Sequence, residues 1–242
     1  TMDQVTIADV EASIGLGGFY YAIVICKVKE DYWRFYPLRT LESAEAETRF
    51  KEFCGGLGKD VIGQLTVYCD AHQSLIRICK SNKVPIRHPP PGRPQANSVI
   101  ERKIGVALSG IRCSLVTGCL PNCFWPFAGP CYALNKNISS GSYAAIHGDF
   151  TATQFVPGQL VFFKPAPTIS KQAKVDPTLM PGVFLDYYFG PDGNFQNQYI
   201  VADLEDFAGK ILHQRIGKQH FNIHRHRTEV VRDPVGTDEP VF

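Results

Sequence analysis

The chain has 242 residues, of which 44% are hydrophobic and 20% are charged, and its formal net charge is +2. This composition is typical of a globular protein with one large or two modest domains, and it excludes a disordered chain. The sequence contains no apolar run of about 18 residues and does not begin with a basic segment followed by an apolar stretch. We therefore expect no membrane span and no signal peptide, and we predict a soluble, intracellular protein.

Three β-prone runs open the chain and predict strands at 5–10, 20–26 and 32–38. The second run is continuously apolar and β-branched, as in a central strand that is covered on both faces. Apolar residues then recur at helical spacing, with Ser43 as the expected N-cap and Gly55 at the end. This helix is expected to cross back over the sheet.

The fourth expected strand, at 64–69, ends immediately before Asp70. A right-handed connection would place this strand beside the first one, which is expected to end near Asp9. Two carboxylates from distant parts of the sequence are therefore expected to converge.

A long helix is expected after a short helix at 73–81 and a proline-rich loop, HPPPGRPQ, that forbids regular structure. The long helix begins near Ala96 and ends near Gly118, and Glu101 lies in its first turns at the edge of an apolar stripe. From this position the glutamate can lean back toward the sheet. The stripe consists of Ile100, Ile104, Leu108, Ile111 and Leu115.

The character of the sequence changes near Gly141, which is surrounded by serines. Beyond it, short β-prone runs separated by turns predict a small barrel. The expected strands lie at 159–163, 182–188, 198–202 and 210–213. We predict a catalytic core at 1–138, a linker at 139–154, a β domain at 155–232 and a tail at 233–242.

Asp9, Asp70 and Glu101 together predict a catalytic site with two Mg²⁺ or Mn²⁺ ions. Carboxylate oxygens are hard ligands, and two cations about 4 Å apart need several of them. Each acid alone has a simpler interpretation: an aspartate at a strand end often forms a turn or a cap, and a glutamate near a helix start complements the helix dipole. The prediction therefore depends on the combination.

Basic residues are unevenly distributed along the chain. Between His72 and Arg112 there are eight lysines and arginines and one acid, and residues 210–227 hold five lysines and arginines, four histidines and no acid. Each Lys or Arg that neutralises a phosphate releases condensed counterions, so these segments indicate polyanion binding. A solvated basic face is the alternative.

The eight cysteines are expected to be free thiols, because a chain of this size with an apolar core does not need disulfides. No CxxC pair occurs, and Cys119 and Cys123 lack partners at zinc-finger spacing. Trp33 and Trp125 have apolar neighbours and are expected in the core rather than on a stacking surface.

Residues 66–104, from TVYCD to VIERKI, resemble the integrase core of copia-class LTR retrotransposons. Residues 18–54 resemble a strand pair and helix of that family, 120–128 (LPNCFWPFA) its helix after the core, and FVPGQLVFFKP with KVDPTLMPGVFLDYY its SH3-like domain. The resemblance implies an α/β fold: an RNase H-like mixed five-stranded sheet with flanking helices, followed by a small SH3-like β-barrel. It also implies phosphodiester hydrolysis and DNA strand transfer by a D,D,E triad.

The same resemblance implies DNA partners, namely the element ends and target DNA, together with a homo-oligomer and a nuclear location. Gln95 and Asn97 are expected to cap the helix of Glu101 or to contact the nucleic-acid backbone, and an ordinary N-cap is favoured for Asn97. His72 and His88 are candidate general bases, although a histidine in a basic loop is more often a phosphate contact or solvated. The residues expected to bind nucleic acid are Arg93, Gln95, Asn97, Arg102, Lys103, Arg112, Lys218, Arg225 and Arg227.

The chain departs from the family pattern beside Asp70. Ala71, His72 and Ser74 replace residues that members usually carry there, and 30 residues separate Asp70 from Glu101, fewer than in the family. The family's N-terminal His/Cys zinc module and reverse transcriptase have no counterpart in the sequence, so we expect a fragment or a reduced derivative. A catalytically inactive integrase that binds DNA or a protein partner is therefore an alternative, and a nuclease-like module with no nucleic-acid role is a third.

Overall fold

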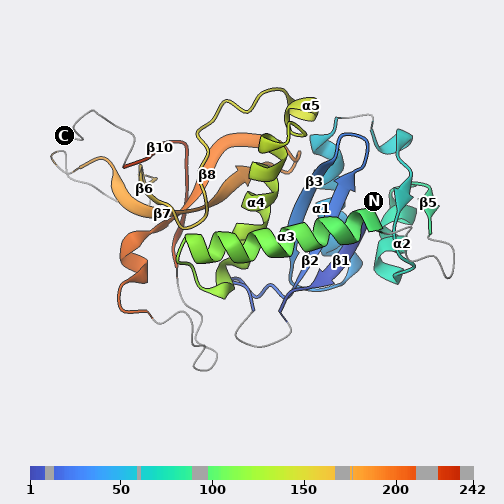
Figure 1. Ribbon diagram of the computed structural model, residues 1–242, viewed down its shortest axis with the longest axis horizontal. Helices are drawn as coiled ribbons and strands as arrows, with labels where there is room; N and C mark the ends of the chain where they lie inside the picture. Colours follow the sequence, from blue (N-terminus) through green and yellow to red (C-terminus); the bar gives the residue numbers. More distant parts are fainter. Residues whose placement is uncertain are drawn as a thin grey trace.

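The computed structural model describes residues 1–8, 14–58, 61–88, 98–166, 175, 177–210 and 223–234. The structure is mixed α/β, in agreement with the expected class, and Figure 1 shows α4 between the first sheet and the C-terminal strands. The strands are β1 (Met2–Thr6), β2 (Tyr21–Lys27), β3 (Tyr32–Leu38), β4 (Val67–Tyr68), β5 (Ile86–Arg87), β6 (Leu160–Phe163), β7 (Met180–Phe189), β8 (Phe195–Asp203), β9 (Arg225–Thr228) and β10 (Val231–Arg232). The α-helices are α1 (Ser43–Gly56), α2 (Gln73–Ser81), α3 (Ser98–Thr117), α4 (Trp125–Ser139) and α5 (Ala144–His147).

Strands β1, β2 and β3 form an antiparallel sheet in that order. β3 occupies its predicted range, and β2 lies one residue later than predicted. β1 lies earlier than the strand predicted at 5–10, because its ladder with β2 runs from Met2 to Thr6. The amide of Ile7 then donates to the carbonyl of Tyr20 over 3.0 Å, beyond the end of the ladder.

Within the described residues, the five strands that were expected to form one mixed sheet form two separate sheets. β4 and β5 pair in parallel as a separate two-stranded sheet. The Thr1 hydroxyl links the two sheets by donating to the Tyr68 carbonyl over 3.0 Å. β4 is two residues long, and so short a strand offers few ladder hydrogen bonds to a neighbour, which accounts for the division.

Helices cover both faces of the first sheet, and Figure 1 shows α3 crossing it. Ile23 and Ile25 face a core that includes α1 and α2, whereas Ala22, Val24 and Cys26 face a second core that includes α3. This alternation follows from the two-residue period of a strand. The prediction that β2 is covered on both faces is confirmed.

α3 buries three of its five predicted stripe residues fully and the other two in part. Its close approach to α4 was not predicted: the ring of Tyr132 lies over Gly110, where a side-chain carbon would overlap it. Both tryptophans are buried as predicted, with Trp33 1% exposed and Trp125 2% exposed.

The C-terminal strands form a five-stranded antiparallel sheet in the order β10-β6-β7-β8-β9. Its edge strands are adjacent in the chain, so the sheet curls until its edges approach each other. There the Thr228 hydroxyl donates to the Lys164 carbonyl over 2.8 Å, and the Lys164 amide donates to the Val230 carbonyl over 3.1 Å. Three predicted strands lie in this sheet, and residues after Lys210 in the fourth, at 210–213, lie outside the described residues.

The C-terminal sheet packs against α4 and α1. The Tyr187 hydroxyl accepts a hydrogen bond from the Phe155 amide over 2.8 Å and donates to Asn135 on α4 over 3.1 Å. The turn between β7 and β8 meets the end of α1, where a side chain at Gly193 would overlap the Glu52 carbonyl. These contacts join parts of the chain on either side of the predicted linker.

All eight cysteines are free, as predicted. Burial raises the pKa of the Cys54 thiol to about 12, which keeps it protonated and unreactive. Among the described residues, no helix has the length and apolarity needed to cross a membrane.

Candidate functional site

Asp3 and Asp70 line one open pocket of about 600 Å³. Asp3 lies in β1 and Asp70 follows β4, so the pocket forms where the two small sheets meet. Its other lining residues are Gln4, Thr6, Leu41, Ala71 and His72. Two carboxylates from distant segments, Asp3 and Asp70, therefore share one pocket. The predicted convergence of Asp70 with Asp9 stays a prediction, because Asp9 lies outside the described residues.

Asp3 is half-buried and, by strand alternation, lies with Val5 on the face of β1 that the α3 core covers. Its Oδ1 accepts a hydrogen bond from the Gln4 amide over 2.8 Å. Burial raises the pKa of the Asp3 carboxyl, the Gln4 hydrogen bond opposes this rise, and the charges of Asp70 and Glu101 increase it. Asp70 and Glu101 are thus each close enough to Asp3 to repel its negative charge, and a cation bound beside Asp3 would relieve this repulsion.

The predicted triad is placed in part. Asp9 lies outside the described residues, whereas Asp70 and Glu101 are both exposed. Glu101 is in the first turn of α3, the helix that contacts β1, and Figure 1 shows the N-terminus beside that end of α3. Sequence reasoning missed Asp3 because it began the strand at 5, although the alternation from Met2 onward already placed an acid within a β-prone run.

His72 immediately precedes α2 and lines the pocket. Its Nδ1 lies 2.8 Å from the Ser74 hydroxyl, and that hydroxyl donates to Gln4 Oε1 over 2.8 Å. His72, Ser74 and Gln4 thus form a chain of hydrogen bonds from the pocket to β1, in which the tautomer of His72 decides the donor between the ring and Ser74. His72 also opposes the rise in the pKa of Asp3.

His88, the other candidate base, follows β5. Its Nδ1 lies 3.0 Å from the carbonyl of Cys69, which can act only as an acceptor, so Nδ1 donates. The bond joins the end of β5 to the residue before Asp70. His88 therefore helps to position Asp70, and it is not among the residues that line the pocket.

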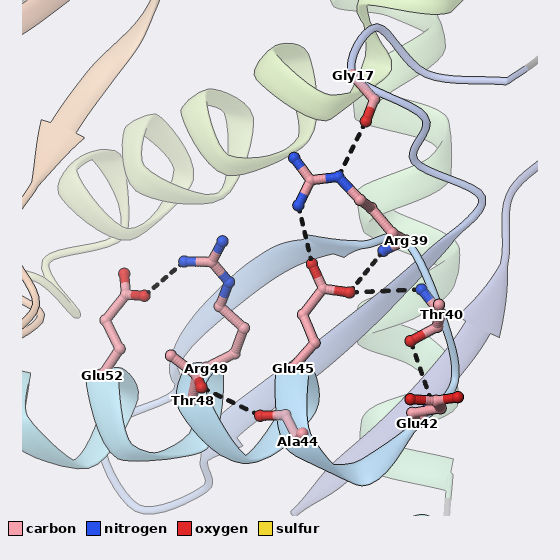
Figure 2. A network of polar contacts seen from close by, with 9 residues as sticks. All are labelled: Gly17, Arg39, Thr40, Glu42, Ala44, Glu45, Thr48, Arg49 and Glu52. Atoms are coloured by element: carbon pink, nitrogen blue, oxygen red, sulfur yellow. Dashed lines mark hydrogen bonds and ion pairs between the residues drawn. The ribbon is translucent and has the colours of Figure 1, made fainter.

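The loop between β3 and α1 supplies one wall of the pocket, and a polar network holds it in place (Figure 2). Glu45 accepts hydrogen bonds from the amides of Arg39 and Thr40, and the Arg39 guanidinium donates to the Gly17 carbonyl over 3.0 Å. Ser43, the predicted N-cap, is instead the first helical residue, and the residue before it makes no capping hydrogen bond through its side chain.

The donor atoms of the pocket suit a hard divalent cation. Asp3 and Asp70 in the pocket, and Glu101 in the first turn of α3, carry the oxygen ligands that Mg²⁺ and Mn²⁺ prefer. In the part of the chain that the structure describes, no three His, Cys, Asp or Glu side chains are arranged so that they could hold a metal ion.

The residues predicted to bind nucleic acid are dispersed. Arg93, Gln95, Asn97 and Lys218 lie outside the described residues. Arg102 and Arg112 are exposed on α3. Lys103 on the same helix is 16% exposed, bonds Asp31 over 2.7 Å and lies 5.8 Å from the ring of Trp33. Lys103 therefore holds α3 against the β2–β3 turn, and a phosphate would have to displace Asp31 to reach it.

Arg225 and Arg227 are exposed on β9 and alternate there with buried residues. The Arg225 guanidinium lies 5.8 Å from the ring of Phe127, and that of Arg227 lies 4.5 Å from the ring of Tyr188. His226 points to the buried face, and burial lowers its pKa, so it does not add to the basic surface. The two arginines belong to the C-terminal sheet and not to the strands around the pocket.

No protein-family model matches the chain, and no curated protein matches it. Among solved structures, the chain is similar to a chain of the simian T-cell lymphotropic virus intasome, determined by cryo-EM in complex with PP2A regulatory subunit B56 gamma. The TM-score is 0.38 and the sequence identity is 11%, and the match covers 96% of this chain and 76% of that chain. A similarity at this level assigns neither a family nor a function.

Proposed function

We propose that the protein is a metal-dependent polynucleotidyl transferase and endonuclease of the integrase type, with Asp3, Asp70 and Glu101 as its carboxylates. The observation that carries this proposal is the pocket where β1 and β4 bring Asp3 and Asp70 together. Glu101 is near enough to raise the pKa of Asp3. Asp3 thus takes the role that the sequence alone assigned to Asp9.

Two features of the topology support this proposal. Three antiparallel strands lie beside two parallel strands with helices on both faces, which is compatible with an RNase H-like core. The edge strands of the C-terminal sheet are adjacent in the chain, which is compatible with an SH3-like barrel. The sequence at 66–104 resembles a family that combines these two folds.

Two bound Mg²⁺ or Mn²⁺ ions would supply an activated water or DNA 3′-hydroxyl and would stabilise the leaving oxygen. Asp3, whose Oδ1 accepts a hydrogen bond from the Gln4 amide, would hold the ions together with the exposed Asp70 and Glu101. Arg102 follows Glu101 and is exposed, so it can neutralise a phosphate of the bound DNA. This chemistry needs no covalent intermediate on the protein.

The test is a nicking and strand-transfer assay on DNA with Mn²⁺. Asp3→Asn and Asp70→Asn should each reduce activity by about 100-fold or more, because each removes a charged ligand. Glu205→Gln, which changes an exposed acid in the C-terminal half of the chain, should leave activity unchanged.

Asp9→Asn separates the two candidates for the first carboxylate. Full activity in Asp9→Asn supports Asp3. Loss of activity in Asp9→Asn with full activity in Asp3→Asn would return the role to Asp9.

A non-catalytic module that binds DNA or a protein is the second candidate. It is favoured by Ala71 and His72 beside Asp70, and by the open arrangement of the acids among the described residues. Salt-sensitive DNA binding without cleavage in Mn²⁺ would support it. Under the first proposal, the protein would act on DNA in the nucleus as a homo-oligomer.

A further inference from the structure

A second pocket, of about 540 Å³, lies along the C-terminal half of α3, whereas Glu101 lies in the first turn of that helix. Its other walls are the C-terminal half of α4 and the segment 154–159, which leads into β6. Pockets that hold small molecules have volumes of about 300–1,000 Å³ and often lie where two parts of a fold meet. This pocket has that size and that position, and the proposed cleavage chemistry gives it no role.

The apolar part of the lining is held in place by hydrogen bonds. Phe155 is 2% exposed, and its amide donates to the Tyr187 hydroxyl over 2.8 Å, while its carbonyl accepts from Asn135 Nδ2 over 2.9 Å. Tyr132 adds a second aromatic ring to the lining, and Val156, which also lines the pocket, is 48% exposed. Apolar surface is therefore available at a preformed site, which reduces the cost of ordering the protein around a ligand.

Lys136 carries the only charge among the described lining residues. It is exposed in the last turn of α4 and has no ion-pair partner in the part of the chain that the structure describes. Asp233 approaches from outside the lining, where its Oδ2 accepts a hydrogen bond from Gln159 over 3.0 Å. The carbonyls of Lys136, Asn137 and Ile138 accept hydrogen bonds from the chain that follows, which reduces the negative potential at this end of α4.

From this lining we propose that the pocket binds a small organic anion, an aromatic ring that carries one carboxylate. The ring would pack against Phe155, because aromatic side chains favour aromatic partners, and the carboxylate would pair with Lys136. Ser114 and Thr117 contribute hydroxyl groups to the lining, and a hydroxyl can donate to a carboxylate. The site uses none of the three carboxylates of the proposed active site, so this inference is independent of the proposed function.

The experiment titrates the full chain with 2-naphthoate and with 2-naphthamide, a neutral molecule of similar shape, and measures binding by calorimetry. The native chain should bind the acid about two- to fivefold more tightly than the amide, the contribution of one exposed ion pair. Lys136→Gln should abolish this preference and leave the affinity for the amide unchanged. Lys80→Gln is the matched control, because Lys80 is also exposed in the last turn of a helix but does not line the pocket, and it should keep the preference.

Cys113 reports whether the ligand occupies this pocket. It is an exposed free thiol in the lining, and Cys119 is an exposed free thiol outside it. At about ten times its Kd, 2-naphthoate should slow the alkylation of Cys113 by iodoacetamide about tenfold, because only the empty pocket reacts. The rate at Cys119, measured in the same sample by peptide mass spectrometry, should not change.

Four results would overturn the inference: no binding of 2-naphthoate, equal affinities of the native chain for acid and amide, a preference for the acid that survives in Lys136→Gln, or equal slowing at both thiols. Equal slowing would show that the probe covers the surface without selecting the pocket. Lys136→Gln changes an exposed side chain, and an unchanged affinity for the amide would verify that the variant has folded. None of these results bears on cleavage through Asp3 and Asp70.

Discussion

Asp3 and Asp186 are two acids with raised pKa values in opposite surroundings. Asp186 in β7 is 8% exposed, and burial raises its pKa well above the usual range despite the opposing effects of the Tyr187 amide and the Arg34 guanidinium. Asp3 is half-buried in an open pocket, and two other acids add to the effect of burial.

The difference distinguishes a structural acid from one that can bind a ligand. Near Asp186 the protein supplies its own cation: Arg34 is 3% exposed and lies 3.6 Å from the ring of Phe189, between the two parts of the fold. Near Asp3 the neighbouring charges are mainly negative, and solvent reaches them. A cation from solution can therefore change the energy of Asp3 but not that of Asp186.

The largest expected effect is a loss of stability at the contact between α1 and the C-terminal sheet. Gly193→Ala should lower the free energy of unfolding by about 2–4 kcal/mol, because Gly193 has a φ of 73° and an added side chain would overlap the Glu52 backbone. Denaturant unfolding measures the loss. Mn²⁺ binding by the folded protein should not change.

Gly105→Ala is the control for Gly193→Ala. Gly105 lies in α3 with open space around its added carbon, so the substitution should stabilise the protein by about 0.5–1 kcal/mol. If Gly193→Ala were as stable as the native protein, the contact between α1 and the C-terminal sheet would not be structural.

A smaller loss of stability is expected from Tyr187→Phe. The substitution removes the hydroxyl that the Phe155 amide and Asn135 Oδ1 bond, while Asn135 Nδ2 keeps its bond to the Phe155 carbonyl, and it should cost about 1–3 kcal/mol by thermal or denaturant unfolding. Tyr199→Phe, which removes one longer bond of 3.3 Å to Thr153, should cost less. Equal losses would show that the additional hydrogen bonds of the Tyr187 hydroxyl do not stabilise the interface.

Strong local periodicity made much of the fold predictable. α2 and β3 have their predicted bounds because their apolar residues alone define their buried faces. The start of β1 was not predictable in this way, since its position is set by hydrogen bonds to β2, a strand that begins at Tyr21. A strand with mixed polarity takes its register from its partner.

In the candidate site, as in the fold, the sequence marks the residues whose signals are local and not those that depend on distant parts of the chain. Asp70 follows a strand and Glu101 starts a helix, and both signals are local. The role of Asp3 depends on a neighbour about 70 residues away in the chain, and Lys103 was expected to bind DNA although its partner, Asp31, lies 72 residues away. Contacts of this range depend on the packing of α3 and are not visible in the spacing of residues.

Asp3→Asn should have a modest effect of opposite sign: without metal, the variant should be more stable than the native protein. The pKa of Asp3 is higher in the folded than in the unfolded protein, so folding is penalised increasingly as the pH rises through that range and the penalty persists above it. The variant should therefore be more stable at pH 7 without metal, by roughly a few tenths of a kcal/mol after solvent screening, with no gain near pH 3. Melting temperatures in EDTA and in Mn²⁺ measure both effects.

In Mn²⁺ the native protein should be more stable than Asp3→Asn, because the native protein gains stability from the bound ion and the variant does not. Asp186→Asn is the matched control. It should also remove a penalty that grows with pH, since burial raises the pKa of Asp186, but it should keep the full response to Mn²⁺. A metal response that survives in Asp3→Asn would place the ion elsewhere.

The smallest expected effect concerns two neighbouring residues on α3. Arg102 is exposed, whereas Lys103 is paired with Asp31. Arg102→Gln should reduce the slope of log affinity against log salt by about 0.9, the contribution of one phosphate contact. Lys103→Gln should leave that slope unchanged and cost less than about 1 kcal/mol of stability, because its charge is already paired with Asp31. If both variants reduced the slope equally, DNA would compete successfully for Lys103, and the pairing seen in the structure would describe only the state before binding.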